Sequence, residues 1–147
     1  MAHSFVSSTF HIVFSTKNRI QIIPEEGQQV LWNYVAGIAR NHGTGVLAVG
    51  GTNNHIHVLI ALPASVDLSS AVRDLKANSR RWMRETNRLF SWQEGYGAFS
   101  VSPSQLDRVK NYIVSQKTHH ASRSFEDEFA SMLRAANMQF NPGDALG

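Results

Sequence analysis

The sequence predicts an α+β domain with a ferredoxin-like βαββαβ order: an antiparallel sheet with helices on one face, plus a C-terminal helix after the last strand. Apolar residues alternate along four short segments, as in half-buried strands, and recur every three to four residues along the longer segments between them, as in helices. No repeat or linker divides the 147 residues, so we expect one domain spanning 1–147. A hydrophobic content of 42% supplies enough side chains for a core.

Four segments are predicted to be strands. Residues 5–15 alternate with Phe10, Ile12 and Phe14 on one side. Residues 44–50 and 54–62 predict the next two strands, which the turn-forming residues at 51–53 would join as a hairpin. A short last strand is expected at 99–101.

Helices are predicted between and after these strands. The first begins at Pro24 and ends at Gly43, and the second covers about 65–88. A third helix of roughly 103–120 follows the last strand and carries Tyr112 at its centre. Ser124, with an acidic residue three positions later, is typical of the start of a further short helix.

The composition excludes several classes of protein. There is no cysteine, which excludes disulfides and thiolate zinc sites. The first residues lack the basic and apolar regions of a signal peptide, and no apolar run is long enough to cross a bilayer. We therefore expect a cytoplasmic protein with no membrane contact.

Positive charge is concentrated in one predicted helix. The chain has a net charge of +3, whereas residues 73–88 alone carry six basic and two acidic residues, hence +4. The candidate DNA-binding residues of this helix are Arg73, Lys76, Arg80, Arg81 and Arg84. Lys17 and Arg19, after the first strand, are further candidates. A solvated helix face and an exposed loop explain the same charges, so both interpretations stay open.

His55 and His57 are the first candidate ligands. Alternate residues of a strand share a face, so the two imidazoles should lie side by side on the face that the helices leave free. Neutral imidazole binds several divalent metals, which makes the pair a candidate metal site. A pair of ordinary surface histidines is the alternative.

Tyr112 and Gln116 lie four residues apart and should share one face of the third helix. A tyrosine oxygen can open a phosphodiester by attacking phosphorus and staying attached. Its pKa of ~10 makes it a weak nucleophile near neutral pH, so it needs a polarised phosphate. A metal ion held by two histidines and a neutral amide oxygen would provide this polarisation.

Together these residues resemble a known family, the HUH nucleases with a single tyrosine. The resemblance is greatest to the small transposases of insertion sequences that move as single-stranded DNA, and to their REP-associated relatives. It covers five segments in the family's order: residues 11–17, 51–59, 75–82, 92–101 and 112–116.

The resemblance implies a transposase that cuts and rejoins single-stranded DNA at hairpin-containing ends. Tyr112 would be the nucleophile and form a 5′-phosphotyrosine, and His55, His57 and Gln116 would hold Mg²⁺ or Mn²⁺. It also implies a bacterial or archaeal homodimer, with Tyr112 acting in its own subunit or in a composite site with its partner. No organic cofactor is expected.

Two other functions remain possible. A non-transposing, domesticated relative would bind single-stranded nucleic acid without cutting it. A metallohydrolase using metal-bound water is ranked last, because the sequence shows no obvious acidic ligand or base near the histidines. The roles of His119 and His120 stay open between phosphate or proton handling and capping of the helix end. Trp92, Tyr96 and Phe99 are expected to pack the loop rather than stack on bases.

Overall fold

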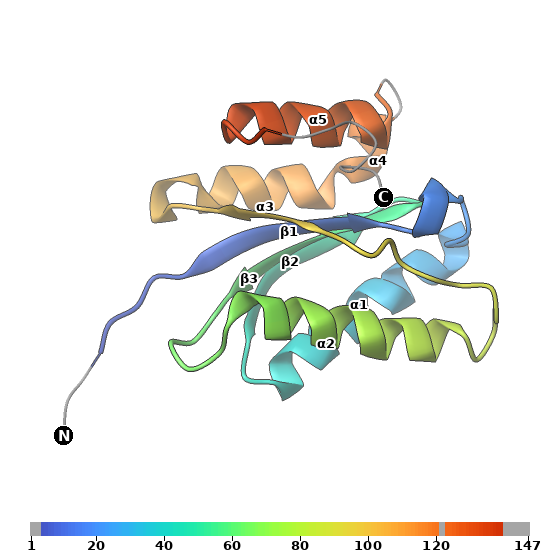
Figure 1. The fold of residues 1–147 in the computed structure, drawn as a ribbon, viewed down its shortest axis with the longest axis horizontal. Helices are drawn as coiled ribbons and strands as arrows, with labels where there is room; N and C mark the ends of the chain where they lie inside the picture. The colour runs from blue at the N-terminus through green and yellow to red at the C-terminus, as the bar shows by residue number, and fades with distance from the viewer. Residues whose placement is uncertain (1–3, 121–122, 140–147) are drawn as a thin grey trace.

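A four-stranded antiparallel sheet forms the centre of the molecule in the computed structural model, which describes residues 4–120 and 123–139 (Figure 1). The strands are β1 (Thr9–Ser15), β2 (Gly45–Gly51), β3 (His55–Ala61) and β4 (Gly97–Ser100), in the order β2-β3-β1-β4. This is the strand order of a ferredoxin-like sheet, so the fold predicted from the sequence is confirmed.

Helices α1 (Glu25–Asn41) and α2 (Leu68–Met83) cover one face of the sheet. Every second residue of β1 and β3 points toward these helices and is apolar. Ile12, Phe14 and Ile56 belong to this set and are fully buried. The Asp67 side chain caps α2 by accepting a hydrogen bond from the backbone of Ser70. The main hydrophobic core therefore lies between these helices and the sheet, as the sequence periodicity predicts.

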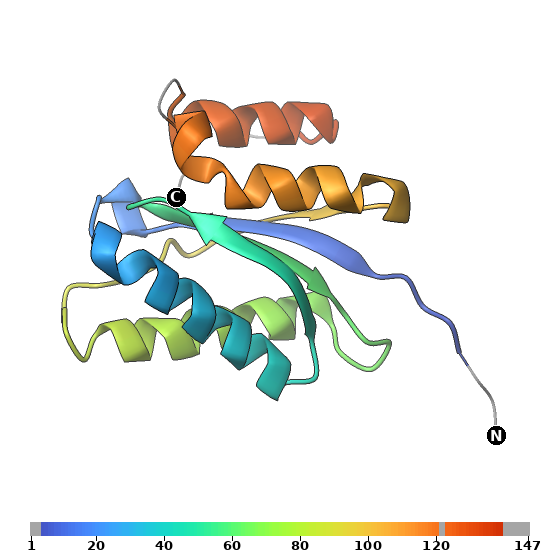
Figure 2. The same cartoon turned by 180° about the vertical axis from the view of Figure 1, so that it is seen from behind.

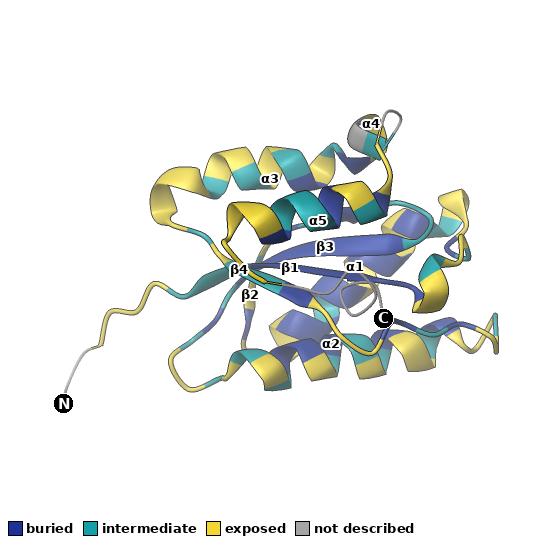
Figure 3. Cartoon of the chain, turned by 45° about the horizontal axis from the view of Figure 1, so that its top comes forward, coloured by how far each residue is buried: buried dark blue, intermediate teal, exposed yellow. Residues whose placement is uncertain are grey.

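Three more helices cover the opposite face, α3 (Leu106–Val114), α4 (Gln116–His120) and α5 (Phe125–Ala135) (Figure 2). The prediction of two helices on one face and a further C-terminal helix is confirmed, but the expectation that the opposite face stays available is wrong. The reason is visible in the second set of alternating residues, where Val13 packs against Phe125 and Phe129, and Leu59 against Ile113. These contacts bury both faces of β1 and β3 (Figure 3).

The predicted helix over 103–120 is in fact broken. A short 3-10 turn, η2 (Pro103–Gln105), precedes α3, and the chain bends at Ser115 before α4. At the bend, the Ser115 hydroxyl donates to the carbonyl of Asn111 (2.7 Å), and the Gln116 amide donates to the carbonyl of Tyr112 (3.2 Å). Side-chain donors thus compete for carbonyls of the last turn of α3. The bend turns Gln116 inward, where it is 1% exposed.

Other boundaries differ by several residues. The first strand begins at Thr9 instead of residue 5, and η1 (Lys17–Arg19) is a 3-10 turn after it. Helix α2 ends at Met83, not near 88, because hydrogen bonds from Asn87 to Met83 and from Phe90 to Asn87 fold the chain back. This turn returns Phe90 to the core, where it is fully buried.

Candidate metal and tyrosine site

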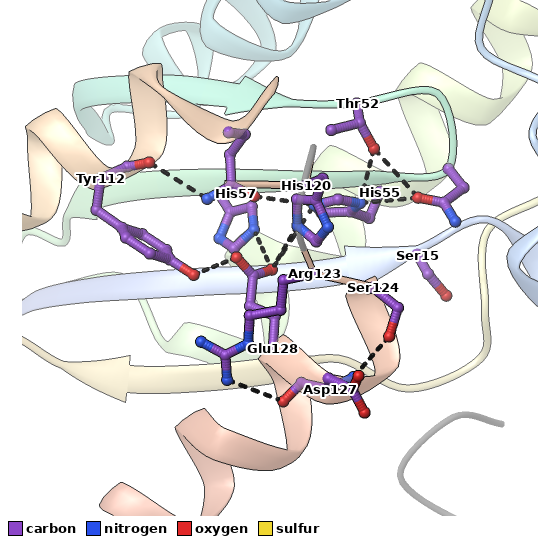
Figure 4. A network of polar contacts seen from close by, with 12 residues as sticks. Ser15, Thr52, His55, His57, Tyr112, His120, Arg123, Ser124, Asp127 and Glu128 are labelled. Carbon is purple, nitrogen blue, oxygen red and sulfur yellow. Dashed lines mark hydrogen bonds and ion pairs between the residues drawn. The ribbon is translucent and has the colours of Figure 1, made fainter. Parts of the chain in front are cut away.

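The two predicted histidine ligands lie side by side in β3, on the face covered by α3–α5. His55 and His57 are both 0% exposed, so the expected exposed pair is in fact buried. Figure 4 shows the two imidazoles among His120, Tyr112 and Glu128. Their rings lie 5.1 Å apart between centroids. The alternative of two ordinary surface histidines is excluded by this burial.

Each of the two imidazoles is held at its Nδ1 atom by a neighbouring side chain. His57 Nδ1 lies 2.7 Å from His11 Nε2, and His55 Nδ1 lies 2.8 Å from Asn54 Oδ1. Fixing one ring nitrogen orients the other, as is usual for histidines that bind metals. Both Nε2 atoms consequently face the same space beneath α4 and α5. His11, in β1, is itself buried at 6% exposure.

Two oxygen atoms from the helical layer converge on those nitrogens. Gln116 Oε1 lies 3.0 Å from His55 Nε2, and Glu128 Oε1 lies 3.1 Å from His57 Nε2 and 3.7 Å from His55 Nε2. Glu128 is 1% exposed, and His55, His57 and Glu128 offer ligand atoms within 4.8 Å of one another. These three residues form a group that could hold a metal ion.

The donor chemistry of this group fits a cation. Burial, followed by the nearby His57, lowers the pKa of His55 to about 3, so its ring is neutral. Asn54 Oδ1 accepts the Nδ1 proton, which leaves the Nε2 lone pair facing the Gln116 carbonyl oxygen. Octahedral ligands at ~2.1 Å from an ion are about 3 Å apart. The observed separations match a set of ligands around one ion.

Tyr112 reaches this cluster from α3. Its Oη donates a hydrogen bond to Glu128 Oε2, and its ring centroid lies 5.9 Å from that of His57. Burial raises the pKa of Tyr112 far above its usual value, and the Glu128 carboxylate raises it further. The phenol is therefore protonated and oriented by Glu128. The structure brings together all four predicted residues, Tyr112, His55, His57 and Gln116.

Glu128 is the residue that sequence reasoning missed. The expectation that no acidic group lies near the histidines is wrong, because α5 inserts this carboxylate between His57 and Tyr112. Burial favours a raised pKa for Glu128, but contacts with His120, His57 and Tyr112 hold its pKa well below the usual range. One signal was available in the sequence: Glu128 shares the apolar stripe of its helix with Phe125 and Phe129.

His120 also belongs to the cluster. Its Nε2 lies 3.2 Å from Glu128 Oε1, and its ring centroid lies 4.5 Å from that of His55. Of the two interpretations, proximity to the reacting groups is therefore favoured over capping of the helix end. The side chain of His119 lies outside the described residues.

The predicted DNA-binding residues of α2 lie across the sheet from this cluster, so the structure does not unite the two (Figure 1). Lys76 donates to the backbone carbonyls of Gln93, Glu94 and Gly95, at 2.6–2.9 Å. Arg84 likewise donates to the carbonyl of Phe90 (2.7 Å). Contacts within the fold thus occupy both side chains.

The remaining basic candidates are five in number. Arg73, Arg80, Arg81 and Lys17 are exposed. Arg19 forms an ion pair with Glu126 of α5 (3.0 Å), so this loop residue touches the helix that carries Glu128.

The aromatic residues Trp92, Tyr96 and Phe99 have different surroundings in the structure. Trp92 packs against Phe14 and Phe90 and donates its indole hydrogen to Ser79 (2.9 Å), which confirms its predicted packing role. Tyr96 is 37% exposed. Phe99 packs beside Val13, on the face of the sheet that carries His55 and His57.

A buried histidine pair, an amide and a carboxylate beside a tyrosine define a candidate metal-assisted phosphodiester-cleaving site. The family model "Transposase IS200 like" matches residues 4–116, and the chain therefore belongs to the IS200-like transposase family. The chain is a transposase by this membership. No helix among the described residues is long and apolar enough to span a membrane.

Individual relatives agree with this assignment. The chain is 26% identical over 125 residues to the transposase for insertion sequence element IS200 of Salmonella typhimurium, covering 79% of this chain and 81% of that protein. It is 24% identical over 115 residues to the ISDra2 transposase TnpA of Deinococcus radiodurans, covering 73% and 82%.

Two solved structures share the fold. A putative transposase from Deinococcus radiodurans R1 superposes with a TM-score of 0.63 at 21% identity, over 77% of this chain and 94% of that one. A REP-associated tyrosine transposase bound to a REP hairpin superposes with a TM-score of 0.62 at 18% identity, over 82% and 73%.

Proposed function

We propose that this transposase cuts and rejoins single-stranded DNA through a covalent 5′-phosphotyrosine on Tyr112. The observation that carries the proposal is the shared carboxylate: Glu128 contacts Tyr112 Oη through one oxygen and His57 Nε2 through the other. The nucleophile and the candidate metal ligands thus lie within one hydrogen-bonded cluster of a single chain.

In the proposed reaction, Tyr112 Oη attacks the phosphorus of the scissile phosphodiester. The new Oη–P bond replaces the bond from phosphorus to the 3′ oxygen, which leaves as a 3′-hydroxyl. The proton lost by the phenol balances the proton gained by that oxygen. Attack by a 3′-hydroxyl on the phosphotyrosine reverses the step and joins the strands without ATP.

The metal would be held by His55, His57 and Gln116, and we add Glu128 to this set. When bound, it would polarise a non-bridging oxygen of the phosphate. The buried carboxylate makes two of the four ligand atoms oxygens, which favours Mg²⁺ or Mn²⁺ over softer ions. Through their Nδ1 contacts, His11 and Asn54 hold the two imidazoles in orientation.

We further propose hairpin-containing single strands as the substrate. The support is the fold shared with the tyrosine transposase bound to a REP hairpin, together with the exposed arginines of α2. The test incubates the protein with hairpin-bearing oligonucleotides and Mn²⁺, then separates covalent adducts on a denaturing gel. Wild type should form an adduct and Tyr112→Phe none, while Tyr34→Phe, changed on α1, should match wild type.

Two results oppose the proposal. An adduct that persists in Tyr112→Phe would place the nucleophile elsewhere. Binding without any adduct under Mn²⁺ or Mg²⁺ would favour the non-transposing binding module instead.

We also propose that the tyrosine acts within its own subunit, whether or not the protein forms a homodimer. Tyr112 already contacts the Glu128 carboxylate of its own chain, beside its own histidines. Mixing inactive His57→Ala with inactive Tyr112→Phe distinguishes the two arrangements. Restored cleavage in the mixture would require a composite site, and light scattering on the same samples reports the oligomeric state.

A further inference from the structure

A cleft of about 890 Å³ opens between α3 and α5, with β1 and β4 as its floor. Tyr112 and Glu128 line it together, so the cleft leads directly to the proposed nucleophile. Figure 3 shows α3 and α5 side by side over this part of the sheet.

Apolar side chains form much of the cleft surface. Phe99 of β4, Val109 of α3 and Met132 of α5 line it and are only partly buried, so each still presents apolar surface. Such a surface suits the flat face of an unpaired base, and stacking on an aromatic ring contributes ~1–3 kcal/mol per base. Because every base has such a face, this surface does not require a particular sequence.

Two arginines add positive charge to the same cleft. Arg108 lies on α3 and Arg123 precedes α5, and both are exposed. Arg108 is held by Gln105 (2.7 Å), while Arg123 contacts the carbonyl of Asp127 (3.2 Å) and the Ser131 hydroxyl. Guanidinium groups placed in this way suit phosphate oxygens.

We propose that this cleft binds the single-stranded nucleotide adjoining the scissile phosphate, with its base on Phe99 and Met132 and its backbone near Arg108 and Arg123. The proposal rests on the function proposed above, because it takes Tyr112 as the end at which the strand is cut. Stacking requires an unpaired base, so the cleft selects single strands over duplex DNA. It would hold the strand next to Tyr112 between cutting and rejoining.

Photochemical crosslinking tests the location. The probe is an oligothymidylate with 5-iodouracil at a central position, bound to Tyr112→Phe protein so that the strand stays intact. Irradiation should attach it to peptides containing Phe99 or Met132, identified by mass spectrometry. Crosslinks confined to α2 or to other surfaces would overturn the proposal.

A pair of arginine variants tests the charge. Arg108→Gln should weaken binding of the same oligonucleotide about three- to tenfold in fluorescence anisotropy and reduce the dependence on salt. Arg134→Gln is the matched control, because Arg134 is exposed on the same helical layer but does not line the cleft. Equal affinities in the two variants would argue against the cleft.

The two proposals can fail separately. Crosslinks in the cleft with no adduct in wild type would retain the binding site and reject the tyrosine chemistry. An adduct on Tyr112 with no crosslink to the cleft would retain the chemistry and reject the binding site.

Discussion

The two faces of the sheet use the same strands for different purposes. In β3, Ile56, Val58 and Ile60 point to the α1–α2 side and are fully buried in hydrocarbon, while His55 and His57 point to the α3–α5 side and are equally buried among polar groups. A buried polar group is costly unless it is paired. Here the polar groups pair with one another, so one face is a hydrocarbon core and the other carries the candidate metal and tyrosine site.

The face covered by α3–α5 has fewer buried apolar residues than the face covered by α1 and α2. Its buried apolar residues form two small clusters, one around Val13 and Phe129 and one around Leu59 and Ile113. Tyr112, Gln116 and Glu128 all come from this layer. We infer that α3–α5 form the less stable layer, because local stability follows the number of buried apolar contacts.

The largest contrast is expected between neighbouring residues of β3. His57→Ala removes a candidate metal ligand and should reduce adduct formation more than about 100-fold, since even indirect ligand partners are worth about 10–100-fold. Ile56→Ala leaves a cavity in the other layer and should cost about 2–5 kcal/mol of unfolding free energy. Denaturant unfolding and adduct assays on both variants measure the contrast.

Metal affinity separates these variants further. Ile56→Ala should bind Mn²⁺ as wild type does while it remains folded, and His57→Ala should not. Full adduct formation in EDTA by wild type would remove the metal from the reaction altogether.

The next largest effect is expected from a change at Glu128, the proposed acidic ligand of the metal. Glu128→Gln keeps the size of the side chain but removes its charge, and should weaken Mn²⁺ binding about tenfold or more, measured by calorimetry. Asp127→Asn is the matched control, with the same charge change on an exposed neighbour in α5. Equal affinities in the two would show that Glu128 is not a ligand, while leaving His55 and His57 in place.

The sequence predicts the first face better than the second, for a physical reason. Alternation in β1 and β3 and helical spacing in α1 and α2 are local patterns, and both were interpreted correctly from side-chain periodicity. The histidine pair and the tyrosine helix were also found from local spacing and from the family resemblance. The covering of the second face by α3–α5 was not predicted. It follows only when both alternating sets of strand residues, one for each face of the sheet, are recognised as buried.

Glu128 shows why the rest of the site was harder to predict from the sequence. It is 71 residues from His57 in sequence, and an acidic residue in the first turn of a helix is usually explained by the helix dipole. Phe125 and Phe129 of the same helix pack against Val13 of the sheet, and this packing places the Glu128 carboxylate on the side of the histidines. The segment also lies beyond residues 4–116, which are those matched by the family model.

A smaller effect is expected where α3 comes close to the backbone of β2. Gly50 of β2 lies beneath α3, and a Cβ atom there would lie 2.2 Å from the carbonyl oxygen of Ile113. Gly50→Ala should therefore displace α3 and cost about 1–3 kcal/mol. Because Tyr112 precedes Ile113, adduct formation should fall more than stability suggests.

Gly37 provides the control for this change. It lies in α1, where an added Cβ meets nothing within 4 Å, so Gly37→Ala should leave adduct formation intact and raise stability by up to ~1 kcal/mol through its higher helix propensity. If Gly50→Ala retained full activity and stability, the close approach of α3 to the sheet would not be required.

The smallest effect is expected for the exposed arginines of α2. Changing one of them tests whether DNA contacts α2 as well as the α3–α5 side of the sheet. Arg81 is exposed on α2, and α2 lies across the sheet from α3, which carries Tyr112 (Figure 1). If it contacts one phosphate of a single strand, Arg81→Gln should reduce the slope of log affinity against log salt by ~0.7. Arg40→Gln, an equal charge change on the exposed side of α1, should have no such effect. Identical slopes would restrict DNA binding to the α3–α5 side, whereas a difference would mean that the strand reaches both faces around an edge of the sheet.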